Sequence, residues 1–91
     1  MRSRYCAFVL ELEPYLLATW HASTRPPTVT FEPGTKWLGL RVEDARDIAV
    51  HEAEVSFVAR YKVGGGSAVR LRERSRFLRE DDGRWYYVRG D

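Results

Sequence analysis

The sequence contains one cysteine, Cys6, among its 91 residues. A single cysteine excludes an internal disulfide and any zinc site built from several thiolates. No apolar run approaches the roughly 20 residues that a membrane span requires. The acidic residues Glu11 and Glu13 near the N-terminus argue against a signal peptide. We therefore expect a cytoplasmic location, no membrane partner, and no metal or other cofactor.

A large excess of charge of one sign is also absent. Fifteen Lys and Arg residues against thirteen Asp and Glu give a net charge of +2, too small by itself to indicate nucleic-acid binding. The positive charge is concentrated in residues 60–91, which contain nine basic and five acidic residues. The chain is 44% hydrophobic and 13% aromatic, a composition that excludes a disordered chain and is typical of one small globular domain.

Apolar spacing predicts two helices at the N-terminus. Pro14 does not fit inside a helix but suits the first turn of one, so we predict a break near residues 12–13 and a second helix over residues 14–20. The apolar stripe at helical spacing consists of Tyr5, Phe8, Val9, Leu12 and Leu16.

After a proline-containing connector, the period of the pattern changes from helical to two. Within the connector we expect only a brief strand at residues 28–31. The first long strand is expected from Lys36, a polar break at residues 43–47, and a second strand from near Ile48. Turn sequences at residues 64–67 and 81–83 separate it from strands at 69–80 and 85–89. Alternation sets Leu38, Leu40 and Val42 opposite Trp37, Gly39 and Arg41.

The same alternation divides the later strands into an apolar and a charged face. One face carries Val55, Phe57, Ala59, Tyr61 and Val63 of the second strand, with Val69, Leu71, Glu73, Ser75 and Phe77 of the third. Segregated helices and strands predict an α+β fold, in which two N-terminal helices pack on the apolar face of a four-stranded antiparallel sheet.

Six segments, taken together and in order, resemble the central domain of the YchJ-like family of bacterial proteins. They are MRSRYCAFV (residues 1–9), YLLATWH (15–21), WLGL (37–40), VSFVARY (55–61), ERSRFL (73–78) and GRWYYV (83–88). The resemblance covers nearly the whole chain, so we expect residues 1–91 to form one YchJ-like central domain.

The resemblance implies a cone-shaped fold of the nuclear-transport-factor-two-like, or cystatin-like, superfamily. A curved sheet there wraps around the helices and often leaves a pocket. It implies no reaction. Members commonly carry a zinc-binding SEC-C motif before or after this domain. These 91 residues contain no such motif, and Cys6 alone cannot replace it. The segment after His21 is shorter than usual in the family, which predicts a missing pocket wall.

Three polar residues are candidates for chemistry. His21 follows a helix and is a candidate general base at the cavity mouth. The interpretation that we favour is a structural histidine near the negative end of the helix dipole. Glu73 and Ser75 lie on the apolar face, where a carboxylate would act as a base or ligand anchor. We favour a structural network instead, with Glu73 contacting Arg60, Arg4 or a tyrosine hydroxyl.

Two larger groups of residues are candidate binding surfaces. A period-two stripe of basic residues suits phosphate groups, unless Glu52 and Glu54 neutralise it as cross-strand pairs or it forms a dimer interface. This stripe consists of Arg70, Arg72, Arg74 and Arg76, with Arg60 and Lys62 beside it. An aromatic cluster is either core or the lining of a ligand pocket, whose candidate residues are Trp20, Tyr61, Trp85 and Tyr87.

Three functional hypotheses follow from the sequence. The first is a non-enzymatic binding or adaptor module that recognises a protein or RNA through the sheet face or the cone mouth. The second is a small-molecule pocket protein or enzyme in which His21 and Glu73 share one cavity. The third is a reduced domain whose function depended on the missing zinc motif. Its only obvious property would be dimerisation, as a homodimer through the sheet.

Overall fold

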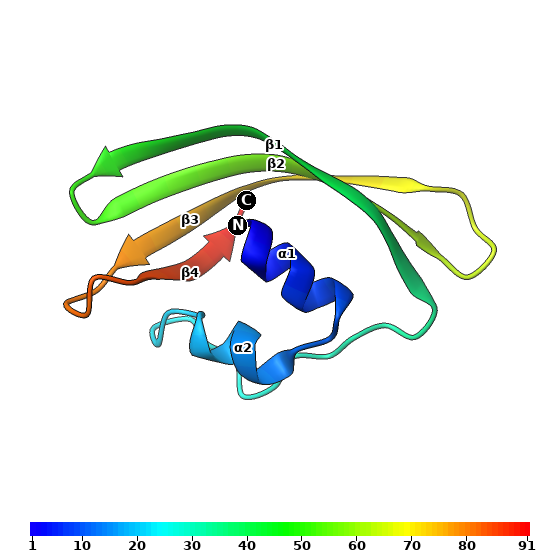
Figure 1. Ribbon diagram of the computed structural model, residues 1–91, viewed down its shortest axis with the longest axis horizontal. Helices are drawn as coiled ribbons and strands as arrows, with labels where there is room; N and C mark the ends of the chain where they lie inside the picture. Colours follow the sequence, from blue (N-terminus) through cyan, green and yellow to red (C-terminus); the bar gives the residue numbers. More distant parts are fainter.

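A computed structural model of all 91 residues confirms the α+β fold. The sheet is an antiparallel meander in the order β1-β2-β3-β4, and it curves over the two helices, which lie on its concave side (Figure 1). The elements in chain order are α1 (Arg2–Val9), α2 (Glu13–Ala18), β1 (Thr35–Ala49), β2 (Glu52–Val63), β3 (Val69–Arg79) and β4 (Trp85–Gly90).

The predicted break between the helices is confirmed. Glu11 adopts a left-handed conformation with φ of 54°. The N–H of Leu12 donates to the carbonyl of Ala7 (2.8 Å), and the N–H of Glu11 donates to that of Phe8 (3.3 Å). This pair of hydrogen bonds is a Schellman motif, which satisfies the last carbonyls of α1. Pro14 then lies in the first turn of α2, where its missing N–H costs nothing.

The prediction of a brief strand at residues 28–31 is wrong. The segment has no regular secondary structure. The N–H of Val29 donates instead to the side-chain carboxylate of Glu13 (3.0 Å), which fastens the connector to the start of α2. Strand propensity does not produce a strand here because both edges of the sheet lie elsewhere, and an extended segment is stable only when its backbone groups find partners.

The prediction of a polar break in the strand at residues 43–47 is also wrong. β1 continues through this stretch as a 15-residue strand, and its turn to β2 lies at residues 50–51. β1 is an edge strand, and an edge tolerates charged side chains because it is solvated. Its pairing with β2 shifts register three times, between Trp37 and Gly39, Val42 and Asp44, and Asp47 and Ala49. Each shift is a bulge that bends the strand.

The first of these bulges changes the face on which Trp37 lies. Trp37 pairs with Tyr61, and Leu40 pairs with Ala59, two residues of β2 that share one face. Strict alternation predicts Trp37 and Leu40 on opposite faces. The extra residue in the bulge places them on the same concave face, where the Trp37 ring packs edge-on against Tyr5 of α1 (5.7 Å between centroids).

The core lies between the helix pair and the centre of the sheet. The predicted faces of β2 and β3 are confirmed, because Phe57, Ala59, Ser75 and Phe77 are buried while the intervening arginines of β3 face outward. Leu16 of α2 is fully buried. Only eight of the 91 residues are buried, so each large core side chain contributes a substantial share of the stability.

Candidate functional site

The outer, convex face of the sheet carries like charges directly opposite one another. Arg60 of β2 lies opposite Arg70 of β3, and Lys36 of β1 lies opposite Lys62 of β2. Neither Arg60 nor Arg70 has an ion-pair partner. Like charges in directly opposed cross-strand positions repel and destabilise a sheet. These pairs therefore form a surface on which the positive charge is not neutralised.

A hollow of about 310 Å³ lies among these arginines on the outer face. Its floor includes Val58, which is buried although it faces outward, because Arg41 and Arg72 lie opposite it on the two neighbouring strands. We call this half of the face the basic end. It comprises Lys36, Arg41, Arg60, Lys62, Arg70 and Arg72, of which Arg41 and Arg72 share one acidic partner, Glu43 (3.2 and 3.8 Å).

The other half of the outer face is neutralised by acidic side chains. The carboxylate of Glu54 lies between Arg76 (3.2 Å) and Arg46 (3.6 Å). Glu54 therefore acts as the predicted cross-strand partner, whereas Glu52 lies opposite Leu78 and pairs with no arginine. The predicted stripe is thus divided: Arg72 and Arg76 have acidic partners, and Arg70 and Arg74 have none within ion-pair distance.

The concave face encloses an aromatic cavity of about 180 Å³ between α1 and the sheet. Two residues of the predicted ligand pocket, Trp20 and Tyr87, line it. The other two, Tyr61 and Trp85, line separate neighbouring hollows. The remaining lining includes Arg4, Tyr5, Phe8, Trp37, Phe57 and Glu73. The predicted pocket is therefore only partly assembled from the predicted residues.

Arg4 also lines this cavity, although the sequence predicts it only as a partner for Glu73. Its side chain is 4% exposed, and Nη1 donates to the carbonyl of Leu16 (3.2 Å) and to Thr19 Oγ1 (2.6 Å). These bonds join α1 to the end of α2. The sequence does contain an indication that Arg4 is buried. It lies four residues before Phe8, which places an arginine within the apolar stripe of the helix.

Glu73 lines the same cavity, and a hydrogen bond from Ser75 fixes its carboxylate. Ser75 Oγ is buried and donates to Glu73 Oε2 (3.0 Å). The carboxyl group lies directly over the Cα of Gly90, at a distance that leaves no room for a Cβ there. Tyr87 lies on the same face. The pKa of its hydroxyl is raised to about 12, mainly because the group is buried and secondly because the negative charge of Glu73 lies nearby.

The raised pKa of Tyr87 predicts a loss of stability at alkaline pH. The folded-state pKa lies above the ordinary value of 10, so the stabilisation is fully present below pH 10 and decreases as pH rises towards 12. We expect urea unfolding at pH 9 and pH 11.5 to show a larger decrease for the wild type than for Tyr87→Phe. Equal decreases in the two proteins would contradict the assignment to Tyr87.

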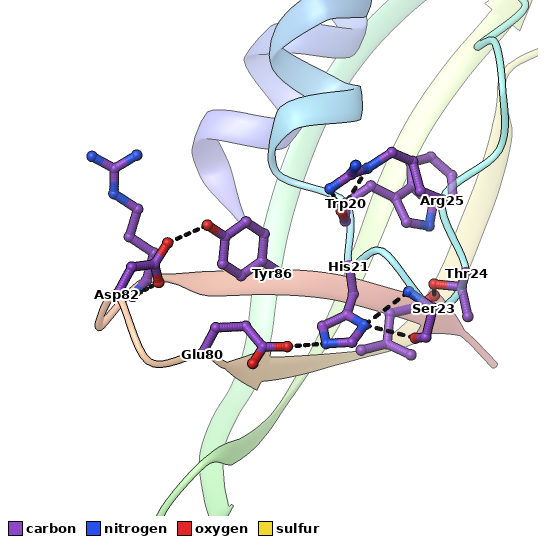
Figure 2. Close-up of polar contacts among 10 residues, drawn as sticks. Trp20, His21, Ser23, Thr24, Arg25, Glu80, Asp82 and Tyr86 are labelled. Atoms are coloured by element: carbon purple, nitrogen blue, oxygen red, sulfur yellow. Dashed lines mark hydrogen bonds and ion pairs between the residues drawn. The ribbon is translucent and has the colours of Figure 1, made fainter.

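His21 lies in a separate polar cluster at the edge of β4. Figure 2 shows its ring between Ser23 and Glu80, with the imidazole Nδ1 2.6 Å from Ser23 Oγ and Nε2 contacting the Glu80 carboxylate. The backbone N–H of His21 donates to the carbonyl of Tyr87 (2.7 Å). His21 lines neither of the two hollows that Glu73 lines. The structure therefore does not bring these two candidates together as an acid–base pair.

Residues 1–90 match the family described as "YchJ, middle NTF2-like domain". The chain belongs to the YchJ-like family. UPF0225 proteins from Polaromonas sp. and Polaromonas naphthalenivorans are 65% and 60% identical to it over 91 residues, which is 65% of the length of each of those proteins.

A solved structure supports the fold of this YchJ-like domain. The solution structure of a SEC-C motif containing protein from Rhodopseudomonas palustris superimposes with a TM-score of 0.85 at 31% sequence identity, covering all of this chain and 73% of the other. The cone-shaped fold that the resemblance implies is therefore confirmed. Neither α1 nor α2 has the length and apolar composition needed to cross a membrane.

Proposed function

We propose that this YchJ-like domain is a non-enzymatic binding module that docks single-stranded RNA on the basic end of the outer sheet face. The observation that carries the proposal is the opposition of Arg60 and Arg70 across the β2–β3 ladder with no acidic neighbour. Such a pair costs stability in the free protein. A phosphate between the two guanidinium groups removes that repulsion and accepts hydrogen bonds from both.

The geometry of the basic end suits a chain of phosphates better than one isolated anion. Arg70 and Arg72 lie two residues apart on β3, a spacing of about 7 Å along the strand. Arg41 and Arg60 extend the charge across β1 and β2. An extended row of cations beside a hollow with an apolar floor is the arrangement that follows a flexible nucleic-acid backbone.

Binding can be measured by fluorescence anisotropy with a labelled oligouridine of about 12 nucleotides at increasing salt. Three or four phosphate contacts predict that log K falls with log salt with a slope of about −2 to −3. We expect Arg60→Glu to weaken binding by at least about tenfold. The same change creates an opposite-charge pair with Arg70, so it should raise the free energy of unfolding by about 0.5 kcal/mol.

Arg79→Glu is the matched control, because it makes the same charge change on the neighbouring strand β3, outside the hollow. It should weaken binding much less than Arg60→Glu. No binding of the oligouridine, or equal losses for the two variants, would contradict the proposal. Displacement of the RNA by poly-glutamate at equal charge concentration would also contradict it and would identify an acidic protein surface as the partner.

Two further expectations accompany this proposal. The cytoplasmic location stays a prediction from the lone cysteine. The homodimer through the sheet also stays a prediction. A dimer that buried the basic end would compete with RNA, so sedimentation of the protein with and without oligouridine distinguishes the two uses of this face.

A further inference from the structure

Arg4 is a buried cation that the protein leaves without a counterion. No carboxylate oxygen lies within 4.0 Å of its guanidinium nitrogens, and its acceptors within the protein serve Nη1 alone. Burial lowers the pKa of the guanidinium below its ordinary value. An uncompensated buried charge is costly, so a group of opposite charge in its surroundings would stabilise the folded protein.

The surroundings of Arg4 form a site with a defined shape. The guanidinium lies over the rings of Tyr87 (4.5 Å to the centroid) and Trp20 (5.2 Å), and all three residues line the 180 Å³ cavity. The indole N–H of Trp20 is buried and has no acceptor. Buried donors without an acceptor are rare in folded proteins, so this one is a second indication of a missing acceptor.

Glu73 limits the charge that the cavity accepts. It lines the same space, yet it lies beyond ion-pair distance of Arg4 and is fixed by Ser75. A single negative charge on a ligand pairs with Arg4, whereas a second negative charge would be repelled by this carboxylate without that compensation. The rest of the lining is mostly apolar and includes Phe8, Trp37 and Phe57, which favours a compact hydrocarbon body.

We infer that this cavity binds a small organic carboxylate with one negative charge and a compact apolar or aromatic body. The two carboxylate oxygens accept hydrogen bonds from Arg4 and from the indole N–H of Trp20. The body of the ligand packs among the aromatic rings of α1 and the sheet. The inference is independent of the RNA proposal, because the cavity shares no lining residue with the hollow on the outer face.

Benzoate, benzamide and phenyl phosphate form a matched set of probes for this site. They share one ring and carry one, no and about two negative charges at pH 8. We expect benzoate to bind with a Kd on the order of 1 mM, and to shift the indole N–H resonance of Trp20 in NMR spectra. Benzamide and phenyl phosphate should each bind at least about tenfold more weakly. These comparisons use the unaltered chain, so they do not depend on any variant folding.

Two variants then assign the interactions. Arg4→Met should lose benzoate binding by at least about tenfold, provided that circular dichroism shows a folded protein. Glu73→Gln keeps the shape of the cavity and should strengthen phenyl phosphate binding relative to benzoate. The inference is overturned if benzamide binds as well as benzoate, if benzoate shifts no resonance of Trp20, or if phenyl phosphate binds the unaltered protein more tightly than benzoate.

Discussion

Replacement of Phe77 by alanine is expected to lower the free energy of unfolding by about 3–4 kcal/mol. Phe77 is 7% exposed near the C-terminal end of β3, and its ring packs edge-on against that of Tyr87 (5.9 Å between centroids). A domain of this size has a total stability of about 5–13 kcal/mol, and its core is small. Urea unfolding followed by tryptophan fluorescence should therefore show a midpoint reduced by about a quarter or more.

Leu71→Ala is the control for this prediction. Leu71 lies on the same face of the same strand but is 38% exposed. Its truncation removes less buried surface and leaves no closed cavity, so we expect a loss of about 1 kcal/mol. A loss for Leu71→Ala that equalled that for Phe77→Ala would mean that the stability does not come from the packed layer between helices and sheet.

Gly90→Ala is expected to lower the free energy of unfolding by about 2 kcal/mol. Gly90 pairs with Ser75 across the β3–β4 ladder, and a Cβ at this position would overlap the carboxyl group of Glu73. The carboxylate must then move, which breaks its hydrogen bond from Ser75. Gly65→Ala is the matched control, because that turn glycine has open space around it and no unusual φ.

A double-mutant cycle tests the cause of the Gly90 effect. In the Glu73→Ala background the overlapping group is gone, so Gly90→Ala should cost less than about 0.5 kcal/mol. The coupling between the two positions should therefore exceed about 1 kcal/mol. Additive losses in the cycle would show that the glycine is required for another reason, and the contact between Glu73 and Gly90 would not be the cause.

Much of the fold follows from local patterns in the sequence. The break at Pro14, the turns at residues 64–67 and 81–83, and the faces of β2 and β3 are all confirmed. Each depends on interactions between residues close in sequence: proline geometry, glycine turns and strict alternation. The family follows from six ordered segments and is confirmed over residues 1–90.

The errors occur where a distant partner decides the outcome. Residues 43–47 are a strand because β2 pairs with them, although their side chains are polar. Residues 28–31 are not a strand because Glu13, 16 residues away from Val29, takes its N–H. Trp37 lies under the helices because a bulge in β1 shifts its register against β2. No local pattern in the sequence indicates these partners.

The candidate sites divide in the same way. The sequence by itself determined that basic residues alternate along the third strand and that aromatic side chains dominate the opposite face. Only the tertiary structure decided that Glu54 neutralises Arg76 while Arg70 lies opposite Arg60, since cross-strand register sets which charges meet. Likewise, only the packing of α1 against the sheet left Arg4 buried against two aromatic rings without a counterion. Charge is a property of the sequence, but its compensation depends on neighbours that the folded chain brings together.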